Sequence, residues 1–296
     1  MRARTLAAVL LAGGLALTAC GKEGTPGDTG GTAPTQAVAS DVKLDGSPTF
    51  EKIKTRGRVV IGVKEDQPGL GFKDPTTNKY SGFDIEIAKL MAAKLGFAED
   101  KIDYKAIASA GREQALINGD VDYYVGTYTI NAGRKEKVGF AGPYYTAGQD
   151  LLVRKDDTAI TGKDALKGKK VCSVTGSTPI KNVKEQGLTE PENITEFQNY
   201  SQCVAKLADG SIDAVTTDDA ILKGYAAQES DKFKVVGKPF SNEPYGIGLS
   251  KEDTVLRGKF FDVLEAALKD GTWQSIYDST LGKSGSAATK PLIERY

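Results

Sequence analysis

Histidine, the side chain that proteins use most often for proton transfer and metal binding near neutral pH, does not occur among the 296 residues of this sequence. A Ser-His-Asp triad and a His-bearing zinc site are therefore excluded. A phosphate-binding G-x-x-x-x-G-K-[ST] loop is missing as well, so nucleotide hydrolysis would have to come from a partner. A lyase would need an acidic side chain with a raised pKa in its site, and Glu65 or Asp66 could be proposed for that role. We expect no enzymatic activity, no cofactor and no bound metal.

The N-terminus indicates export. Arg2 and Arg4 precede an apolar run at residues 6–17 that is too short to span a bilayer, which is typical of a secretory signal at residues 1–19. The signal ends in Leu17-Thr18-Ala19-Cys20-Gly21, which resembles a lipobox, where cleavage precedes a cysteine that then carries diacylglyceryl. An ordinary signal peptide, with Cys20 an incidental thiol, is the alternative.

The stretch after Cys20 is rich in Gly, Thr, Pro and Ala and offers little to bury. We therefore interpret residues 20–45 as a lipidated cysteine followed by a disordered tether on the extracellular face of the cell membrane. Cys172 and Cys203 remain as a pair, and exported proteins form disulfides readily. We predict that these two cysteines are bridged, with two unrelated buried thiols as the alternative.

The chemistry-bearing residues must be positioned by an α/β fold, because apolar periodicity predicts strands alternating with helices. The first strand is expected at residues 59–63 and the first long helix at 82–96, and a second series begins with a strand at 170–174. Extended segments at 149–153 and 245–249 bracket this second series. We interpret them as crossovers between two lobes, which together form a hinge.

The lobes are then discontinuous in sequence. The first comprises residues 46–149 plus 246–296, and the second comprises residues 150–245. Because ligands bind at the carboxyl ends of strands in open α/β sheets, we expect the site in the cleft between the lobes. With 39 basic and 39 acidic residues the formal net charge is zero, so nothing indicates nucleic-acid binding.

Several different short motifs follow one another along the chain. They are Val60-Ile61-Gly62-Val63-Lys64, Gly82-Phe83-Asp84-Ile85-Glu86-Ile87-Ala88, Ile117-Asn118-Gly119-Asp120-Val121-Asp122, Thr129-Ile130-Asn131-Ala132-Gly133-Arg134, Phe140-Ala141-Gly142-Pro143-Tyr144-Tyr145, Thr175-Gly176-Ser177-Thr178 and Gly210-Ser211-Ile212-Asp213-Ala214-Val215. In this order they resemble the polar amino-acid family of extracellular solute-binding proteins, family 3, over residues 50–282. The run from Lys64 to Gly71 and the cysteine pair look like the glutamate-binding lipoproteins of Gram-positive ABC importers. The resemblance implies a two-lobed, periplasmic-binding-protein-like fold of type II. It also implies a monomer that works with ABC permease subunits in the membrane.

The resemblance further implies a set of ligand-binding residues. A zwitterionic amino acid needs a cation or helix-end donors for its α-carboxylate and an anion for its ammonium group. Arg134 would clamp the α-carboxylate, and Asp218 would hold the ammonium, although Asp219 beside it could be only a helix N-cap. The residues expected to support the carboxylate are Thr127, Thr129, Ser177 and Thr178.

The ligand side chain is assigned from two further cations. Lys64 and Arg112 match basic residues that hold the second carboxylate in binders of dicarboxylic amino acids, and two solvated surface cations are the alternative. Tyr200 matches a position where some relatives place a ligand-contacting histidine, so a contact and plain packing both stay open. We predict L-glutamate as the ligand of an ABC importer's binding component, with aspartate and glutamine next. A small-molecule lyase or a sensor domain on the same fold is the other reading.

Overall fold

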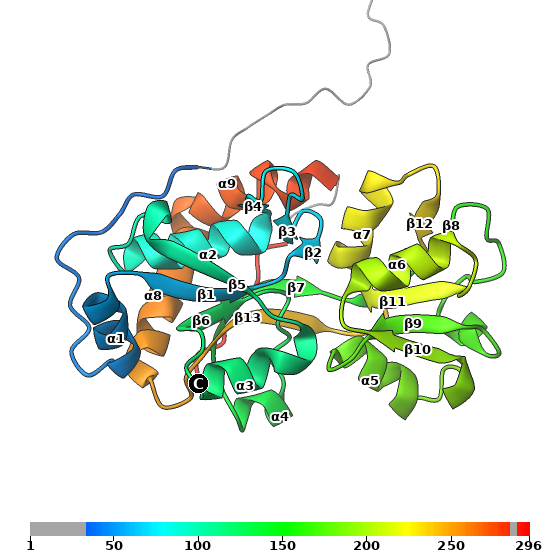
Figure 1. Ribbon diagram of the computed structural model, residues 1–296, viewed down its shortest axis with the longest axis horizontal. Coiled ribbons are helices and arrows are strands. Elements are labelled where there is room, and N and C mark those ends of the chain that lie inside the picture. The colour runs from blue at the N-terminus through cyan, green and yellow to red at the C-terminus, as the bar shows by residue number, and fades with distance from the viewer. Residues whose placement is uncertain (1–33, 285–288) are drawn as a thin grey trace, which may run out of the picture. The chain divides into compact units, whose positions relative to one another are not determined.

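Two five-stranded sheets carry the fold in the computed structural model, which describes residues 34–284 and 289–296 (Figure 1). All of these residues belong to one compact unit, residues 31–296. The predicted signal peptide at residues 1–19, Cys20 and the first part of the tether lie outside the described residues. Within the described ranges, no helix combines the length and the apolar character that a membrane span requires.

The first sheet has the strand order β5-β1-β6-β13-β7, and its neighbours are joined by backbone hydrogen bonds. Its strands are β1 (Val59–Val63), β5 (Ile102–Ala106), β6 (Tyr123–Val125), β7 (Gly139–Ala147) and β13 (Glu243–Leu249). The helices of this lobe are α1 (Pro48–Arg56), α2 (Phe83–Lys94), α3 (Arg112–Ile117), α4 (Ala132–Lys135), α8 (Thr254–Asp270) and α9 (Thr272–Ser279). A small sheet of β2 (Asp66–Gln67), β3 (Gly71–Lys73) and β4 (Tyr80–Ser81) completes it.

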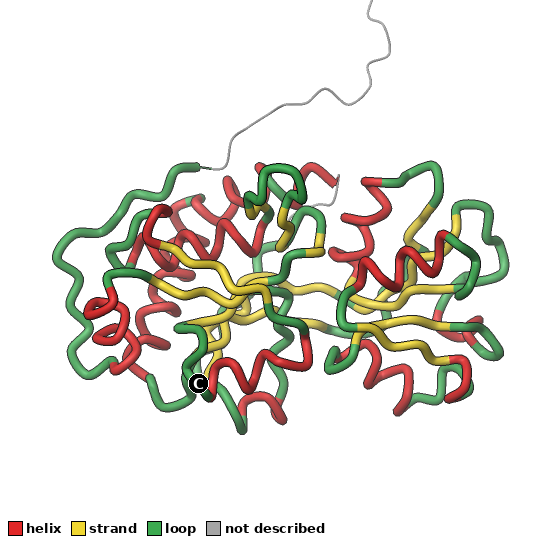
Figure 2. Tube along the Cα trace, viewed as in Figure 1, coloured by secondary structure: helices red, strands yellow, loops and turns green. Residues whose placement is uncertain are grey.

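The second sheet has the strand order β10-β9-β11-β8-β12. Its strands are β8 (Gln149–Arg154), β9 (Val171–Val174), β10 (Ile194–Phe197), β11 (Ala214–Asp218) and β12 (Phe233–Val235). Its helices are α5 (Thr178–Glu185), α6 (Tyr200–Ala208) and α7 (Asp219–Gln228). Figure 2 shows how α6 and α7 lie on one side of these strands and α5 on the other. The two-lobed α/β fold predicted from the sequence is therefore confirmed.

The crossovers lie slightly off the predicted positions. Residues 149–152 of β8 pair with β11 and residues 152–154 pair with β12, so the segment at 149–153 belongs to the second sheet and the first crossing falls at Gly148. Strand β13 already pairs with β7 at Glu243, where it faces Ala147. The chain therefore re-enters the first sheet about three residues before the predicted boundary at 246, because hydrogen bonding to β7 extends the strand toward the hinge.

An aromatic core fixes the C-terminal helices to the first lobe. The ring of Phe83, which opens α2, lies 5.9 Å from the ring of Trp273 in α9 and 6.0 Å from that of Tyr144 in β7. The indole Nε1 of Trp273 donates to the Tyr144 carbonyl over 2.8 Å, so this fully buried side chain keeps its polar group paired. A helix from the chain's end thus holds β7, one of the two strands that lead to the hinge.

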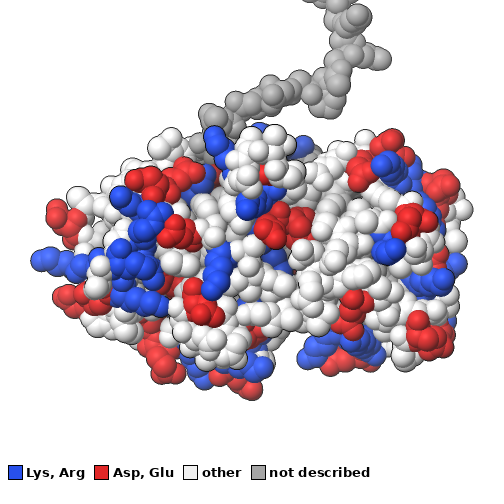
Figure 3. Space-filling model, in the orientation of Figure 1, with Lys and Arg blue, Asp and Glu red and all other residues white. Residues whose placement is uncertain are grey.

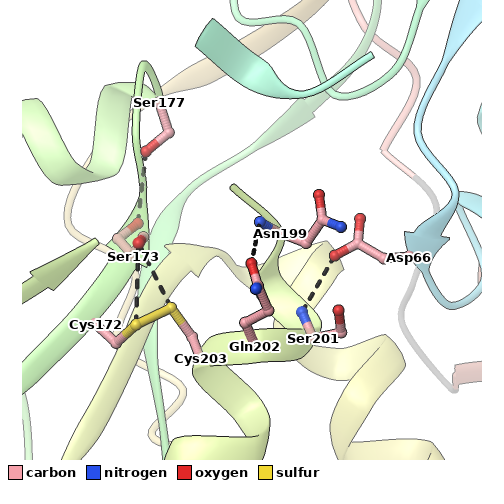
Figure 4. The surroundings of a disulfide bond; sticks show 8 residues. All are labelled: Asp66, Cys172, Ser173, Ser177, Asn199, Ser201, Gln202 and Cys203. Carbon is pink, nitrogen blue, oxygen red and sulfur yellow. Dashed lines mark hydrogen bonds between the residues drawn. A yellow bond between two sulfur atoms is a disulfide. The ribbon is translucent and has the colours of Figure 1, made fainter. Parts of the chain in front are cut away.

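The predicted disulfide is present between Cys172 in β9 and Cys203 in α6, with a Cα–Cα distance of 5.6 Å. Both cysteines are fully buried, and Cys203 lies beside the carbonyl of Ser173 (Figure 4). The bridge closes a separation of 31 residues and ties α6 to the sheet of the second lobe.

The end of the predicted tether packs on the first lobe. The amide of Ala39 donates to the carbonyl of Ala93 in α2 over 2.9 Å. Val42 and Leu44 are partly buried against the main core. The sequence predicted a free segment through residue 45, and this part of the prediction is wrong because these two apolar side chains find a surface to cover.

Candidate functional site

The predicted site residues come together where the strand ends of the two lobes face each other. Lys64 follows β1, Thr127 and Thr129 follow β6, and Asp218 ends β11. Ser177 and Thr178 start α5, and the remaining members lie on α3, α4 and α6. Eight of the nine are buried, namely Lys64, Arg112, Thr127, Thr129, Arg134, Ser177, Tyr200 and Asp218, while Thr178 is half-buried. A buried charged side chain needs a partner of opposite charge or hydrogen bonds. The contacts of the buried charged residues therefore indicate which groups of a ligand the site can hold.

Two cations meet at Ser109. Lys64 Nζ donates to the Ser109 hydroxyl over 2.8 Å, and Arg112 Nε donates to the Ser109 carbonyl over 3.1 Å. Arg112 also donates to the Thr127 carbonyl over 3.1 Å and stacks on the ring of Tyr128 at 4.4 Å. Burial and, next, the charge of Arg112 lower the pKa of Lys64 to about 7. Neither cation has an ion-pair partner among the described residues, so this end of the site favours an anion.

Thr127 is held in an unusual backbone conformation, with φ of 46°. Its amide donates to Asp84 Oδ2 over 3.0 Å, and Tyr144 donates its hydroxyl to Asp84 Oδ1 over 2.8 Å. Asp84 is fully buried, and this burial raises its pKa to about 6. Asp84, which fixes the turn that carries Thr127, was not among the site residues predicted from the sequence.

Gln67 is a second residue that the sequence analysis missed at this end of the site. Its Oε1 accepts from the Thr127 hydroxyl over 3.2 Å. Its Nε2 is buried and has no hydrogen-bond partner in the described part of the chain. This unpaired buried amide, on a side chain that contacts Thr127, adds a further donor to this end of the site.

Arg134 reaches both lobes. It lies on the short helix α4, which is capped by Asn131, whose side chain accepts from the Arg134 amide over 2.9 Å. Its Nη1 donates to the Thr129 carbonyl over 2.7 Å, and its Nη2 donates to the carbonyl of Gly176 in the second lobe over 3.1 Å. Burial lowers the pKa of Arg134 to about 10, so the guanidinium stays charged at neutral pH.

The acidic end of the site centres on Asp218. Tyr245 donates its hydroxyl to Asp218 Oδ2 over 2.6 Å, whereas Oδ1 is buried and finds no partner among the described residues. Burial and, next, the charge of Glu243 raise the pKa of Asp218 to about 8. Asp219 instead accepts from the Gly148 amide and pairs with Lys223 at 2.6 Å, so Asp218 is the carboxylate with a free oxygen. Tyr200 lies nearby, where burial and then Asp218 raise its pKa.

Glu243 is a further residue that the sequence analysis missed. Its Oε2 accepts from the hydroxyls of Thr129 at 2.8 Å and Thr178 at 2.7 Å. The Ser177 hydroxyl caps α5 by accepting from the Ile180 amide over 3.2 Å. The hydroxyl protons of Thr129 and Thr178 are therefore engaged within the protein. Because Pro179 has no amide hydrogen and the Ile180 amide is capped by Ser177, the Thr178 amide remains as the donor at the start of α5 for a ligand. The only signal for Glu243 in the sequence was its place as an acidic residue just before the predicted crossover at 245–249.

The lobes touch closely where β2 meets α6 and α7. Asp66 in β2 accepts from the Ser201 amide of α6 over 3.1 Å (Figure 4). The Tyr225 hydroxyl donates to the Asp66 carbonyl. A Cβ added at Gly224 would lie 2.2 Å from the Pro68 carbonyl oxygen, so the backbones meet without room for a side chain. The described structure is thus a closed arrangement, and Asp66 serves as a contact between lobes.

A solvent-open groove of about 700 Å³ leads to Arg134 between α4 and α5. Its lining includes Asn131, Arg134, Gly176, Thr178 and Lys181. Figure 3 shows an indentation at the lower edge of the molecule, where Figure 1 places α4 and α5, and acidic and basic groups lie interspersed over this face. No group of three or more His, Cys, Asp or Glu residues suited to a metal ion occurs in the described ranges.

The chain is similar to several known proteins. The Glutamate-binding protein GluB of Corynebacterium efficiens is 39% identical over 293 residues, which covers 96% of this chain and 91% of that protein. The Glutamine-binding protein of Geobacillus stearothermophilus is 42% identical over 250 residues, covering 84% of this chain and 92% of that protein. The solved structure of an ancestral arginine-binding protein bound to arginine matches with a TM-score of 0.70 and 37% identity, over 76% of this chain and 98% of that chain.

The match to a family model spans most of the described chain. Residues 59–283 fit the model of the bacterial extracellular solute-binding proteins, family 3. This range includes both lobes and every buried charge of the site described above. The chain therefore belongs to the bacterial extracellular solute-binding proteins, family 3.

Proposed function

We propose that this protein is the substrate-binding component of an ABC amino-acid importer and that its ligand is L-glutamate. The observation that carries the proposal is the convergence of Lys64 and Arg112 on Ser109, because each cation is buried and has no carboxylate partner among the described residues. Relatives named for glutamate and for glutamine support the amino-acid class. A neutral side chain would leave these cations unpaired, at a cost of several kcal/mol before relaxation.

The contacts suggest one orientation for the amino acid. Its α-carboxylate would meet Arg134 and the Thr178 amide at the start of α5, and its ammonium would meet Asp218 Oδ1. Its γ-carboxylate would then reach Lys64 and Arg112. The ligand carries a net charge of −1 at neutral pH, which offsets the excess of positive charge at the Ser109 end.

Binding energy drives a motion in this proposal. The ligand docks on the first lobe through Arg134, and the second lobe closes over it with Asp218. The closed arrangement, with Asp66 against Ser201, is then the form that the permease recognises. We further propose that the exported chain is held at the membrane through Cys20, so that the binding lobes stay close to the permease.

Three substitutions test the assignment by calorimetric titration. Arg134→Ala should abolish binding of every amino acid, because all of them share the α-carboxylate. Lys64→Ala and Arg112→Ala should mainly remove the preference for glutamate over glutamine, and Lys79→Ala, at an exposed lysine, serves as the control. Equal losses for glutamate and glutamine would reject the specificity assignment. Turnover of glutamate or of prephenate-like acids would reject the binding role in favour of a lyase.

A further inference from the structure

The carboxylate of Glu243 lies at the start of β13, where the chain returns to the first lobe. We propose that Glu243 makes the site demand an α-ammonium group, by holding the hydroxyl protons of Thr129 and Thr178 away from the ligand. The inference rests on the proposed function, since it concerns the amino end of the same ligand. It assigns a role in selectivity to a residue outside the predicted set.

Proton counting at the two hydroxyls gives the first step. A threonine hydroxyl has a single proton to donate and two lone pairs that accept. Thr129 Oγ1 and Thr178 Oγ1 lie 2.8 and 2.7 Å from Glu243 Oε2, whereas the two hydroxyl oxygens are 3.4 Å apart. Hydrogen bonds to a carboxylate are short and strong, so both protons point to Glu243. Toward any other group, these hydroxyls can only accept.

Burial and a third donor hold Glu243 in this position. Glu243 is 3% exposed, and its Oε1 accepts from the Ser241 hydroxyl over 2.7 Å. Glu243 therefore receives hydroxyl protons from Thr129 in the first lobe, from Thr178 in the second lobe and from the segment that joins them. The arrangement exists only when the lobes are closed, because one threonine comes from each lobe.

The same strand places these acceptors beside Asp218. Tyr245, two positions after Glu243, forms a backbone bridge with Thr129 and donates its hydroxyl to Asp218 Oδ2 over 2.6 Å. The unpaired Asp218 Oδ1 and the two threonine oxygens together form a set of acceptors. On the other side of Thr129, its carbonyl accepts from Arg134, so the site is negative toward β13 and positive toward α4.

An ammonium group supplies three donors and matches such a set of acceptors. The 2-oxo acid of the same carbon skeleton presents a carbonyl oxygen there, which only accepts. Buried acceptors would then face an acceptor and stay unpaired, and sites of this kind reject the unmatched analogue by on the order of 10³-fold or more. Glu243 strengthens the rejection by its charge and by fixing the direction of the hydroxyls.

The test compares L-glutamate with 2-oxoglutarate in calorimetric titrations of protein refolded free of ligand. Glu243→Gln removes the charge but keeps an acceptor, whereas Glu243→Met removes both at similar length. Glu252→Gln, at an exposed residue just after β13, is the matched control. We expect glutamate affinity to fall about tenfold in the Gln variant and further in the Met variant, with 2-oxoglutarate unchanged or bound better.

A tenfold smaller ratio of glutamate affinity to 2-oxoglutarate affinity in Glu243→Met supports the proposal. Equal losses of affinity for both ligands overturn it, because they would show that the role of Glu243 is purely structural. If the Met variant does not fold, a ratio that stays unchanged in Glu243→Gln overturns it. If the wild type prefers another amino acid, the proposed ligand fails, and the same comparison with that amino acid and its 2-oxo analogue still decides the role of Glu243. A wild type that binds no amino acid overturns both.

Discussion

The preference for glutamate over glutamine should fall as pH rises, because it depends on the charge of Lys64. Burial and the neighbouring Arg112 lower the pKa of Lys64 to about 7 in the unliganded site. The γ-carboxylate of glutamate needs the ammonium form of this lysine, while the amide of glutamine does not. Glutamate binding therefore takes up a proton at alkaline pH, and glutamine binding has no such requirement.

The size of the effect follows from the fraction of sites that carry the charge. With a pKa near 7, Lys64 is charged in about 90% of molecules at pH 6, in about half at pH 7 and in roughly 10% at pH 8. The apparent affinity for glutamate scales with this fraction. Asp218, whose pKa burial raises to about 8, must lose its proton for either ligand, so its contribution cancels in the ratio. The glutamate to glutamine ratio should drop roughly tenfold between pH 6 and pH 8.

Calorimetric titrations of both amino acids at pH 6, 7 and 8 measure this ratio directly. Repeating them in buffers of different ionisation enthalpy counts the protons taken up. Lys64→Arg should keep a high ratio at all three pH values, because guanidinium stays charged. Lys64→Met should give a low ratio without pH dependence, with glutamate bound at least about 30-fold more weakly through the loss of a buried charge partner. A wild-type ratio that stays constant from pH 6 to pH 8 would refute the reasoning.

Three further predictions concern closure, stability and the disulfide. Gly224→Ala should weaken ligand binding tenfold or more without lowering the melting temperature of the unliganded protein, because the added Cβ meets the Pro68 carbonyl only across the lobes. Gly258→Ala, in open space on α8, is the control. Equal ligand affinities in the two variants would contradict the contact in the closed state. Asp218→Asn should abolish binding yet stabilise the unliganded protein by about 2 kcal/mol at pH 8 and hardly at all at pH 4, as thermal denaturation can show. The sign follows from a folded-state pKa above the unfolded one, which makes the ionised form costly once the pH exceeds about 4. Replacing Cys172 and Cys203 by serine should cost about 3 to 4 kcal/mol in denaturant unfolding, given the 31-residue separation, and an unchanged midpoint would contradict this.

The sequence predicted most of the scaffold because its signals are local. The apolar run of β1 and the stripe of α2 identify themselves by composition and period, and glycines mark the turns. The pairing of Cys172 with Cys203 followed from export and from the count of cysteines. The hinge was less well located, since the length of β13 depends on pairing with β7, about a hundred positions earlier along the chain.

The basic residues of the site and Asp218 were predicted from sequence motifs, whereas the residues that orient the site were not. Asp84 and Glu243 act through hydrogen bonds to Thr127, Thr129 and Thr178, which only the folded chain brings near. The use of the Ser177 and Thr178 hydroxyls within the protein was likewise invisible in the sequence, because both residue types serve equally as caps and as ligand contacts. The close approach at Gly224 depends on the lobes being closed, a property that no local pattern encodes.

The central claim is that the buried Lys64 and Arg112 select an amino acid with a second carboxylate. The most direct measurement is a calorimetric titration of the refolded, ligand-free protein with L-glutamate, L-aspartate and L-glutamine at pH 7. We predict one binding site with glutamate bound most tightly and no consumption of the ligand. Tighter binding of glutamine, or no binding of any of the three, would contradict it.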